Sequence, residues 1–529
     1  MTEPLDDSLP VTRWQVASRW AYRHRQALVL SWLVLLWWAT FYRLGALRHD
    51  RFWTFGFDLG LFDQAIWLVS RFKDPFITLR GLDVWGHHGN FVFYLFVPFY
   101  WLGAGAKFLL VAQLTSQVAG AIGVYLLCRD IIARSKWIGV VLASAMLLHP
   151  SMQFLSWEYF HPETFAIGPI VLSYWAWRTQ RWKLFWAMTI LAMSCKEDVA
   201  LVYLVLGLLI LARKQFRLGG YIAGAAALWY VAVTKVLIPW RNPAGPFYEG
   251  HFFSEYGGTM GSVVRTILRH PSRFWGDITA GSRREFYIRL WFPVAFVPFL
   301  AADTLLLAAP MLLAVVIAGI PWVQDYRYHY VAIPLAITFV ASVEAIRRLR
   351  VPWRRNLAVG TIAVTSLISA VSWGVGPGTR NFDKGYWPHT SSEGYLDILF
   401  GNLDTPGGWA IATAKANAVA LVPPNASVSA AFNVNPHLAH RDEVYEWPNP
   451  WIGTNWGICN IDRLPDPASV QWIVVDRRHV NSDPMQSRLL EHLLREEFVV
   501  RLDEVDVVAA ERVRPPLSPA PIAPASCPG

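Results

Sequence analysis

"QALVLSWLVLLWWATFYRLGA", residues 26–46, is almost wholly apolar and has about the length of a helix that crosses a bilayer. A basic segment precedes it and contains Arg13, Arg19, Arg23 and Arg25. This order is similar to a signal peptide, but the bulky and charged residues that follow offer no small-residue cleavage site. The stretch therefore predicts an uncleaved first transmembrane span, with the basic N-terminus (1–25) in the cytoplasm.

The composition is that of a membrane protein with several spans. Of the 529 residues, 54% are hydrophobic and 16% are charged, and the mean hydropathy is +0.30. A soluble protein of this length is more polar. The net charge of +9 does not indicate a nucleic-acid partner, because the lysines and arginines cluster between apolar runs. Such clustering is the positive-inside pattern of membrane proteins.

About eleven apolar runs are candidates for transmembrane helices, although several are short. Basic residues gather in alternate loops, as at Arg129 and Arg347. Eleven spans place these loops on the cytoplasmic side. We expect a transmembrane domain over 26–374 with long outer loops at 47–106 and 239–287. The runs lie near 26–46, 107–128, 137–155, 163–178, 182–195, 199–213, 218–238, 288–302, 304–320, 330–346 and 355–373.

Residues 375–513 form a different region, in which hydrophobic runs are short and turn residues are frequent. The helical periodicity of SRLLEHLLREE (487–497) predicts an amphipathic helix. Four segments are typical of strands bounded by turns: PPNASVSAAF (423–432), DEVYEWP (442–448), VQWIVVDRR (470–478) and FVVRLDEVDVVAAE (498–511). We expect a small extracytoplasmic α/β domain, followed by a disordered Pro-rich tail at 514–529.

The segment FDLGLFDQAIW (57–67) places two carboxylates in an apolar and aromatic stretch soon after the first span. On a helical wheel Asp58 and Asp63 flank one apolar stripe, so we expect an amphipathic helix on the outer membrane surface with both carboxylates at its edges. The structural alternative for Asp58 is a helix N-cap. Both aspartates are candidate catalytic residues, and the structural alternative for Asp63 is a solvated edge residue.

Four further motifs bring ionisable residues to the predicted outer ends of helices. They are GLDVWGHHGNF with His87 and His88, SWEYFHPETFAI with Glu158, His161 and Glu163, SCKEDVALV with Lys196, Glu197 and Asp198, and PWVQDYRYHYVAIP with Arg327, His329 and Tyr330. Each has a structural alternative, such as a hydrated turn for the three consecutive charges. Adjacent histidines alone are a poor metal site, whereas an arginine among aromatic residues suits a phosphate. Because ionisable groups near a membrane usually mark function, we expect these residues to line one outward-facing site.

The motifs resemble a bacterial membrane-protein family known as domain of unknown function 2079 (DUF2079). The resemblance rests on FDLGLFDQAIW, GHHGNFVFYLFVPFY, FHPETFAI, KEDVAL and YRYHYVAIP in this order, and it covers roughly residues 50–480. In one place the chain departs from the pattern, since the family's second motif more often reads Asp-His where His87-His88 stands here. A carboxylate role at position 87 is therefore not implied.

The architecture is also similar to the GT-C superfamily of polyprenyl-phosphate-sugar-dependent glycosyltransferases. In that superfamily an acidic residue early in the first outer loop acts as general base, and Asp58 occupies that place here. The resemblance implies an inverting transfer of a sugar from a polyprenyl-phosphate donor to an envelope glycan, lipid or protein at the outer face of the cytoplasmic membrane. Arg327 and Lys196 would then stabilise the leaving phosphate. A divalent metal could bridge carboxylates and phosphate, but the motifs do not require one.

Two other functions are compatible with the composition. A lipid or solute transporter should place its ionisable residues near the bilayer midplane, whereas here they lie at outer helix ends. An envelope scaffold that binds through its C-terminal domain would explain that domain, but it would not explain the acidic and basic motifs. The transferase is therefore the favoured hypothesis.

Overall fold

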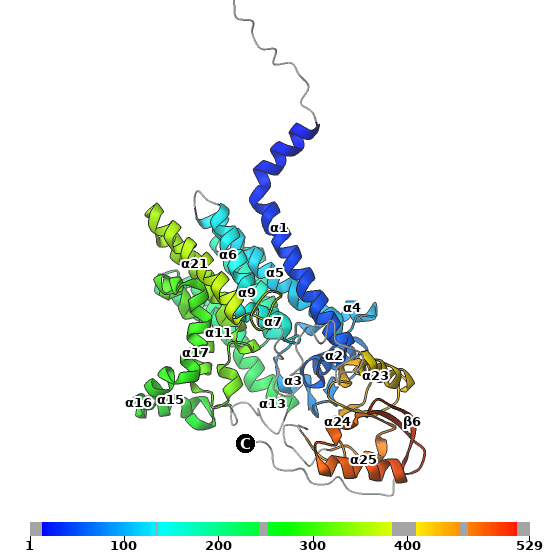
Figure 1. Cartoon of the computed structure of the whole chain (residues 1–529). Coiled ribbons are helices and arrows are strands. Elements are labelled where there is room, and N and C mark those ends of the chain that lie inside the picture. The colour runs from blue at the N-terminus through cyan, green and yellow to red at the C-terminus, as the bar shows by residue number, and fades with distance from the viewer. Residues whose placement is uncertain are drawn as a thin grey trace, which may run out of the picture.

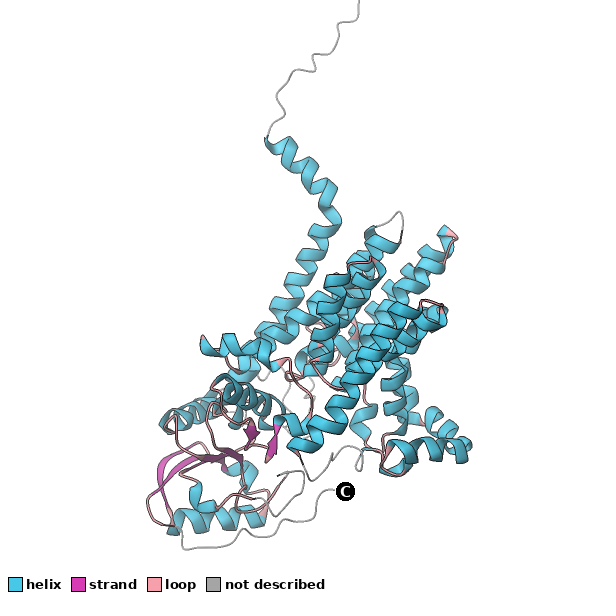
Figure 2. Ribbon diagram, turned by 180° about the vertical axis from the view of Figure 1, so that it is seen from behind, coloured by secondary structure: helices cyan, strands magenta, loops and turns pink. Residues whose placement is uncertain are grey.

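The computed structural model describes residues 13–132, 136–242, 252–382, 409–454, 456 and 464–515. It shows a bundle of long helices with a small sheet domain at one end (Figure 1 and Figure 2). The first helix, α1 (Arg13–Asp50), runs along the bundle and extends beyond it. Most of the predicted tail and parts of the predicted N-terminal segment, loop 239–287 and C-terminal domain lie outside the described residues.

Within the described residues, six helices are long and apolar enough to cross a membrane, or up to seven if the bent pair α6 (Lys136–Leu148) and α7 (Pro150–Trp157) is one span. Helix α20 (Ala332–Arg348) is central, since 89% of its apolar window is buried, against 22% in α21 (Pro352–Trp373). The six lie at Ser18–Asp50, Ala106–Ile131 (α5), Phe216–Arg241, Val297–Ile317, His329–Arg348 and Pro352–Trp373. Apolar helix faces that are left uncovered by protein suit contact with lipid.

The predicted mainly helical membrane protein with a C-terminal sheet region is confirmed, whereas the count of eleven spans stays a prediction. Each of the eleven ranges lies largely on helix. However, α9 (Ile167–Arg178), α10 (Trp182–Met193) and α11 (Val199–Ala212) are shorter than a straight span of about 20 residues.

The helix of the eighth predicted span (288–302) is interrupted inside that range, before the predicted boundary with the ninth span. Ala295 and Phe296 have φ angles of 52° and 55°, beside Pro293, which cannot donate a helical hydrogen bond. Further on, Asp303 pairs with Arg213 at 2.7 Å and with Arg348 at 2.5 Å. Asp303 therefore lies between Arg213 and Arg348, at the C-terminal ends of α11 and α20, which are called the basic helix ends below.

The loop 47–106, predicted as the first outer loop and called so below, is folded, and its helix α2 (Leu61–Ser70) is buried on nearly all sides. The expectation of an amphipathic helix on the membrane surface is wrong, because α2 packs against α4 (Phe93–Trp101) and is covered by the C-terminal domain. Gln64 Nε2, for example, donates to the backbone oxygen of Arg441 at 3.3 Å. The other elements of this loop are π-helix η1 (Gly56–Gly60), β1 (Phe76–Ile77), β2 (Leu82–Asp83) and α3 (Val84–His87).

The second long loop (239–287), predicted as an outer loop, contains amphipathic helices among its described residues. Helix α15 (Met260–Arg269) begins at a capping box formed by Thr259 and Ser262. It continues into α16 (Pro271–Thr279) and then into α17 (Gly281–Trp291). Among the described side chains of α15 and α16, the exposed large hydrophobic residues are Val264, Leu268 and Trp275. Exposed apolar side chains beside several arginines suit a helix that lies at a membrane surface.

The C-terminal domain is built on a five-stranded sheet of order β4-β3-β5-β7-β6, and a strand lies in each of the four segments expected from the sequence. Strands β4, β3 and β5 are parallel, and β7 and β6 complete the sheet as an antiparallel hairpin. Helix α23 packs on one face, with α25 on the other. The bounds are β3 Val428–Ala430, β4 Val444–Glu446, β5 Trp472–Asp476, β6 Phe498–Glu504, β7 Val507–Arg512, α23 Trp409–Leu421 and α25 Pro484–Glu496.

This domain docks directly on the first outer loop. The backbone N–H of Gly56 donates to Phe432 O at 2.7 Å. A Cβ at Gly56 would lie 2.8 Å from Asn435, so the close approach requires glycine. The ring of His437 stacks on that of His49 at 4.2 Å. Strand β4 also exchanges hydrogen bonds with Thr78, whose hydroxyl donates to Val444 O at 2.8 Å.

Candidate functional site

Asp58 lies in the first turn of η1, where its side chain faces His161 across the loop. The N-cap position of η1 is Phe55, so Asp58 is not the cap that the structural alternative required. His161 Nε2 lies 3.4 Å from Asp58 Oδ1, and 24% of the Asp58 side chain is exposed. The carboxylate is therefore oriented by a buried imidazole while it remains accessible.

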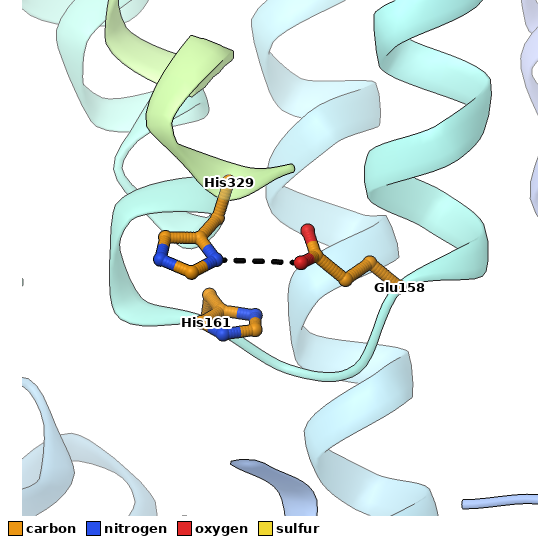
Figure 3. Close-up of side chains that lie close together, drawn as sticks. All are labelled: Glu158, His161 and His329. Carbon is orange, nitrogen blue, oxygen red and sulfur yellow. Dashed lines mark hydrogen bonds and ion pairs between the residues drawn. The ribbon is translucent and has the colours of Figure 1, made fainter. Parts of the chain in front are cut away.

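Glu158, His161 and His329 meet, as Figure 3 shows, and His161 joins this cluster to Asp58. Glu158 follows the end of α7, His161 precedes Pro162, the first residue of α8 (Pro162–Phe165), and His329 starts the short turn before α20. His329 Nδ1 lies 3.3 Å from Glu158 Oε1, and the two imidazole rings stack at 3.8 Å. The turn between α7 and α8 and the start of α20, which lie 171 residues apart in the chain, thus bring predicted residues together.

The charges of this cluster act on one another. Burial alone would lower the pKa of His161, but the carboxylates of Glu158 and Asp58 raise it to about 9. Burial would raise the pKa of Asp58, but the charges of His161, His329 and Arg80 bring it below its ordinary value. At neutral pH the pair is therefore a carboxylate beside an imidazolium.

The same three residues can hold a divalent cation. One ligand atom from each of Glu158, His161 and His329 lies within 4.8 Å of the others. Glu158 Oε2 is buried and has no hydrogen-bond partner among the described residues. Two imidazoles and a carboxylate suit zinc, manganese or iron, and binding would displace the His161 proton. The donor set therefore fits a metal ion, although the motifs alone did not require one.

A second cluster of predicted residues is buried beside the first and is paired internally. Lys196 Nζ lies 2.6 Å from Glu163 and 3.8 Å from Asp198. His88 Nδ1 lies 2.7 Å from Glu197 Oε1. Lys196 and Glu197 are less than a tenth exposed, so this segment is not the hydrated turn of the structural alternative. Burial would lower the pKa of Lys196, but the surrounding carboxylates raise it well above its ordinary value.

The remaining predicted residues occupy different surroundings. His87 is stacked obliquely on His88, with ring centroids 4.5 Å apart, and burial lowers the pKa of His87 well below its ordinary range. Arg327 forms a bidentate ion pair with the nearby Asp325, in which its guanidinium donates to both carboxylate oxygens. Tyr330 packs on His329 at 4.2 Å and so borders the Asp58 cluster.

Asp63 links two parts of the chain. Its Oδ1 accepts a hydrogen bond from the hydroxyl of Tyr100 at 2.6 Å and lies 3.1 Å from Nε2 of His440, which belongs to the C-terminal domain. The side chain is 3% exposed, so Asp63 is not a solvated edge residue. The geometry gives Asp63 a role in attaching the C-terminal domain.

Two further charged residues were not singled out from the sequence. Arg80 is buried, lies 4.4 Å over the ring of Phe57, and its charge acts on Asp58, His87 and Glu446. Arg80 immediately precedes the motif that contains His87, which was an available signal. Glu446 ends strand β4, about 390 residues from Asp58 in sequence, and only the docking of the domains brings it near.

Comparison with solved structures shows the fold. ArnT from Cupriavidus metallidurans bound to undecaprenyl phosphate matches with a TM-score of 0.52 and 13% identity, covering 93% of this chain and 98% of ArnT. The apo form of ArnT matches with a TM-score of 0.50 and 13% identity, covering 94% and 98%. The apo oligosaccharyltransferase of Archaeoglobus fulgidus reaches only 0.39 at 14% identity, covering 84% and 69%, which is too low to support a shared fold. The chain thus has an ArnT-like fold.

Sequence comparison gives the family. No curated protein sequence matches the chain. The sequence profile of the DUF2079 family, described as a predicted membrane protein, matches residues 48–508. This range contains every motif that carried the resemblance, from FDLGLFDQAIW to YRYHYVAIP. The predicted relationship is therefore confirmed, and the chain belongs to the DUF2079 family of membrane proteins.

Proposed function

We propose that this protein is a membrane-embedded glycosyltransferase of the GT-C type, which moves a sugar from a polyprenyl-phosphate donor to an envelope glycan, lipid or protein. The observation that carries the proposal is the accessible Asp58 carboxylate, held 3.4 Å from the buried His161 in the first outer loop. The ArnT-like fold supports it, since an ArnT structure holds undecaprenyl phosphate. Membrane lipids surround the helical part.

Asp58 is the proposed general base of an inverting transfer. An acceptor hydroxyl attacks the anomeric carbon of the donor, and the bond from that carbon to the phosphate oxygen breaks. The hydroxyl proton passes to Asp58, and the polyprenyl phosphate leaves with the bonding electrons. No second protein acid is needed, because a phosphate is a good leaving group without protonation, in contrast to the alcohol released in glycoside hydrolysis.

The other predicted residues surround this carboxylate in the proposal. His161 and Glu158 fix its orientation, and a cation bound by Glu158, His161 and His329 would stabilise negative charge on the phosphate. Lys196 and Arg327 remain the proposed cations for the leaving phosphate, with Arg80 as an addition. The remaining proposed substrate-binding residues are His87, His88, Glu163, Glu197, Asp198 and Tyr330.

The proposal places the protein in the cytoplasmic membrane, with the basic N-terminus inside and the C-terminal domain outside. The support is the arrangement of charge. Arg213 and Arg348 lie together around Asp303, whereas the Asp58 cluster lies against the C-terminal domain. Basic helix ends are typical of the cytoplasmic side.

The test is donor consumption by the purified protein in lipid nanodiscs. Polyprenyl-phosphate sugars are offered with envelope extract as acceptor, and released polyprenyl phosphate is measured by mass spectrometry. We expect release with the wild type and with Asp303→Asn, whose aspartate lies at the basic helix ends, but not with Asp58→Asn. Equal release by Asp58→Asn would remove Asp58 as the base. If the wild type released no lipid phosphate with any donor, the transferase itself would be contradicted.

A further inference from the structure

The turn that carries Glu158 and His161 is held by side chains from two other helices. Figure 3 shows both residues on this turn, which lies between α7 and α8. The last four carbonyls of a helix have no partner within the helix. In α7, two of these carbonyls, those of Leu155 and Trp157, accept hydrogen bonds from side chains of α5 and α1 respectively. The end of α7 beside the candidate site is therefore capped from outside.

Arg48, two residues before the end of α1, joins this turn to the segment that leads to Asp58. Its Nη1 donates to Trp157 O at 2.5 Å, its Nη2 to the Tyr159 hydroxyl at 2.7 Å, and its Nε to Trp53 O at 3.0 Å. Trp53 lies five residues before Asp58, and it is 106 residues from Tyr159 in the chain. One guanidinium thus binds both of the segments whose side chains meet at the candidate site.

Gln113, near the start of α5, holds the backbone of the same turn. Its Nε2 donates to Leu155 O at 2.7 Å and to Tyr159 O at 3.3 Å, and its Oε1 accepts from His161 N at 2.8 Å. The side chain is buried, so these contacts are shielded from water. Both ends of the amide are used, and the N–H that they fix belongs to the residue whose imidazole lies 3.4 Å from Asp58.

A purely structural role for Arg48 is the alternative, because a cation suits the C-terminal end of a helix. Arg48 is only 4% exposed, however. In the part of the chain that the structure describes, its hydrogen bonds go to two carbonyls and one hydroxyl, with no carboxylate among them. A buried charge without a counter-ion is costly, and a neutral donor would be enough to cap α7. The planar fork of an arginine is needed to reach both segments at once.

We propose that Arg48 and Gln113 are positioning residues of the transferase, which hold the turn with His161 against the segment with Asp58. This inference rests on the proposed transferase function. The two side chains take no part in proton transfer; they keep the Asp58 carboxylate oriented toward the acceptor hydroxyl. Because a displacement of about 1 Å can cost a reaction about 10²-fold in rate, loss of either side chain should act mainly on kcat.

The first test is turnover of Arg48 variants in nanodiscs. Arg48→Gln should lower kcat by about 10²-fold with little change in donor KM. Arg48→Lys keeps the charge but not the fork, and it should restore only part of the rate. The matched control is Arg43→Gln, on the exposed side of the same helix, which should keep the wild-type kcat. Wild-type kcat in Arg48→Gln, or full activity in Arg48→Lys, would overturn the role of the fork and leave the transferase intact.

The second test compares two buried glutamines of α5. Gln113→Met keeps the length of the side chain, removes the amide and should lower kcat by about 10-fold. The control is Gln117→Met, at an equally buried residue whose amide accepts from the Ser156 hydroxyl, outside the turn. It should stay near the wild-type rate. Equal losses in the two variants would show a general loosening of the bundle, and Gln113 would not be a positioning residue.

A double-mutant cycle separates positioning from stability. In the Asp58→Asn background, Arg48→Gln should cause little further loss of the residual rate, because the base that Arg48 positions is already absent. Losses that multiply in the double variant would show that Arg48 acts on the fold alone, and the inference would be wrong.

The last test does not depend on turnover. In nanodiscs, the amide of His161 should exchange with solvent about 10-fold faster in Gln113→Met than in the wild type, because its acceptor is gone. It should be unchanged in Gln117→Met. Unchanged exchange in Gln113→Met would show that Gln113 does not hold the turn. If the wild type turns over no donor while the exchange responds as expected, the transferase and the positioning role fail but the contacts stand.

Discussion

Two buried glutamates lie near opposite ends of α20 and differ in how their charge is balanced. Glu344 lies near the C-terminal end of α20, among the basic helix ends, and forms ion pairs with Arg178 and, at 2.8 Å, with Arg347. It also accepts a hydrogen bond from the Tyr174 hydroxyl at 3.1 Å. Glu158, near the start of α20, has one histidine at 3.3 Å, and its second oxygen has no partner among the described residues.

The difference separates a structural charge from a functional one. A buried carboxylate is costly unless it is paired and hydrogen-bonded. Glu344 meets that condition within the protein, so nothing further is needed to hold its charge. Glu158 meets it only in part, and under-satisfied buried groups are characteristic of binding and catalytic sites. The opposite end of the bundle therefore serves as an internal control for the candidate site.

The largest effect that follows from this comparison is on catalysis. Asp58→Asn should lower kcat by about 10²- to 10⁴-fold, because it removes the proposed base without removing volume. The melting temperature in nanodiscs should stay within a few degrees of wild type. Asp303→Asn, at the basic helix ends, should leave turnover unchanged, since its ion pairs are partly exposed. A comparable loss in both variants would show that the two ends do not differ as we propose.

The second effect separates stability from activity at the two glutamates. Glu344→Ala should cost roughly 3 kcal/mol, near the lower limit for a broken buried pair, since Arg178 and Arg347 are 24% and 39% exposed. Thermal unfolding measures this loss. Glu158→Gln keeps the shape of the side chain and should abolish turnover with little change in melting temperature. Equal loss of stability in both variants would contradict the distinction.

Metal binding also distinguishes the Glu158 cluster from the paired charges at the other end of the bundle. Mn²⁺ or Zn²⁺ should raise the melting temperature of the chelator-treated wild type, because the ligand set binds the folded state only. The rise should disappear in His329→Ala. It should persist in His440→Ala, whose histidine contacts Asp63 outside the set. A rise that persists in His329→Ala would place the ion elsewhere.

The smallest effect concerns docking of the C-terminal domain through His440 and Asp63. Burial would lower the pKa of His440, but Asp63 raises it above its ordinary value of about 6.5. The ion pair therefore contributes fully below about 6.5 and is lost as pH rises through the folded-state value. Because His440 is 40% exposed, the effect is modest. The protection factors of the β4 amides, which are corrected for the intrinsic rise of hydrogen exchange with pH, should fall from pH 6 to pH 8 in the wild type and lose this dependence in Asp63→Asn. An unchanged pH response in that variant would remove Asp63 from the docking.

Individual residues show how far prediction from sequence reached. Glu158, His161 and His329 were singled out because they are ionisable residues at the predicted outer ends of helices, and the structure brings them together. Asp63 was grouped with Asp58 because they are neighbours in sequence. In the structure they have different partners, since α2 is covered by the C-terminal domain on a side that the helical wheel had assigned to water.

The apolar runs, the basic loops, the strand segments and the family could be predicted from the amino-acid sequence, because these depend on local composition and on the order of motifs along the chain. Which helix ends meet, which charges are neutralised and which remain available depends on the packing of distant segments. Glu446 illustrates the reason. Its strand signal is local, but its chemistry arises from Asp58 and Arg80, which lie more than 350 residues away in the chain and reach it only when the domains dock.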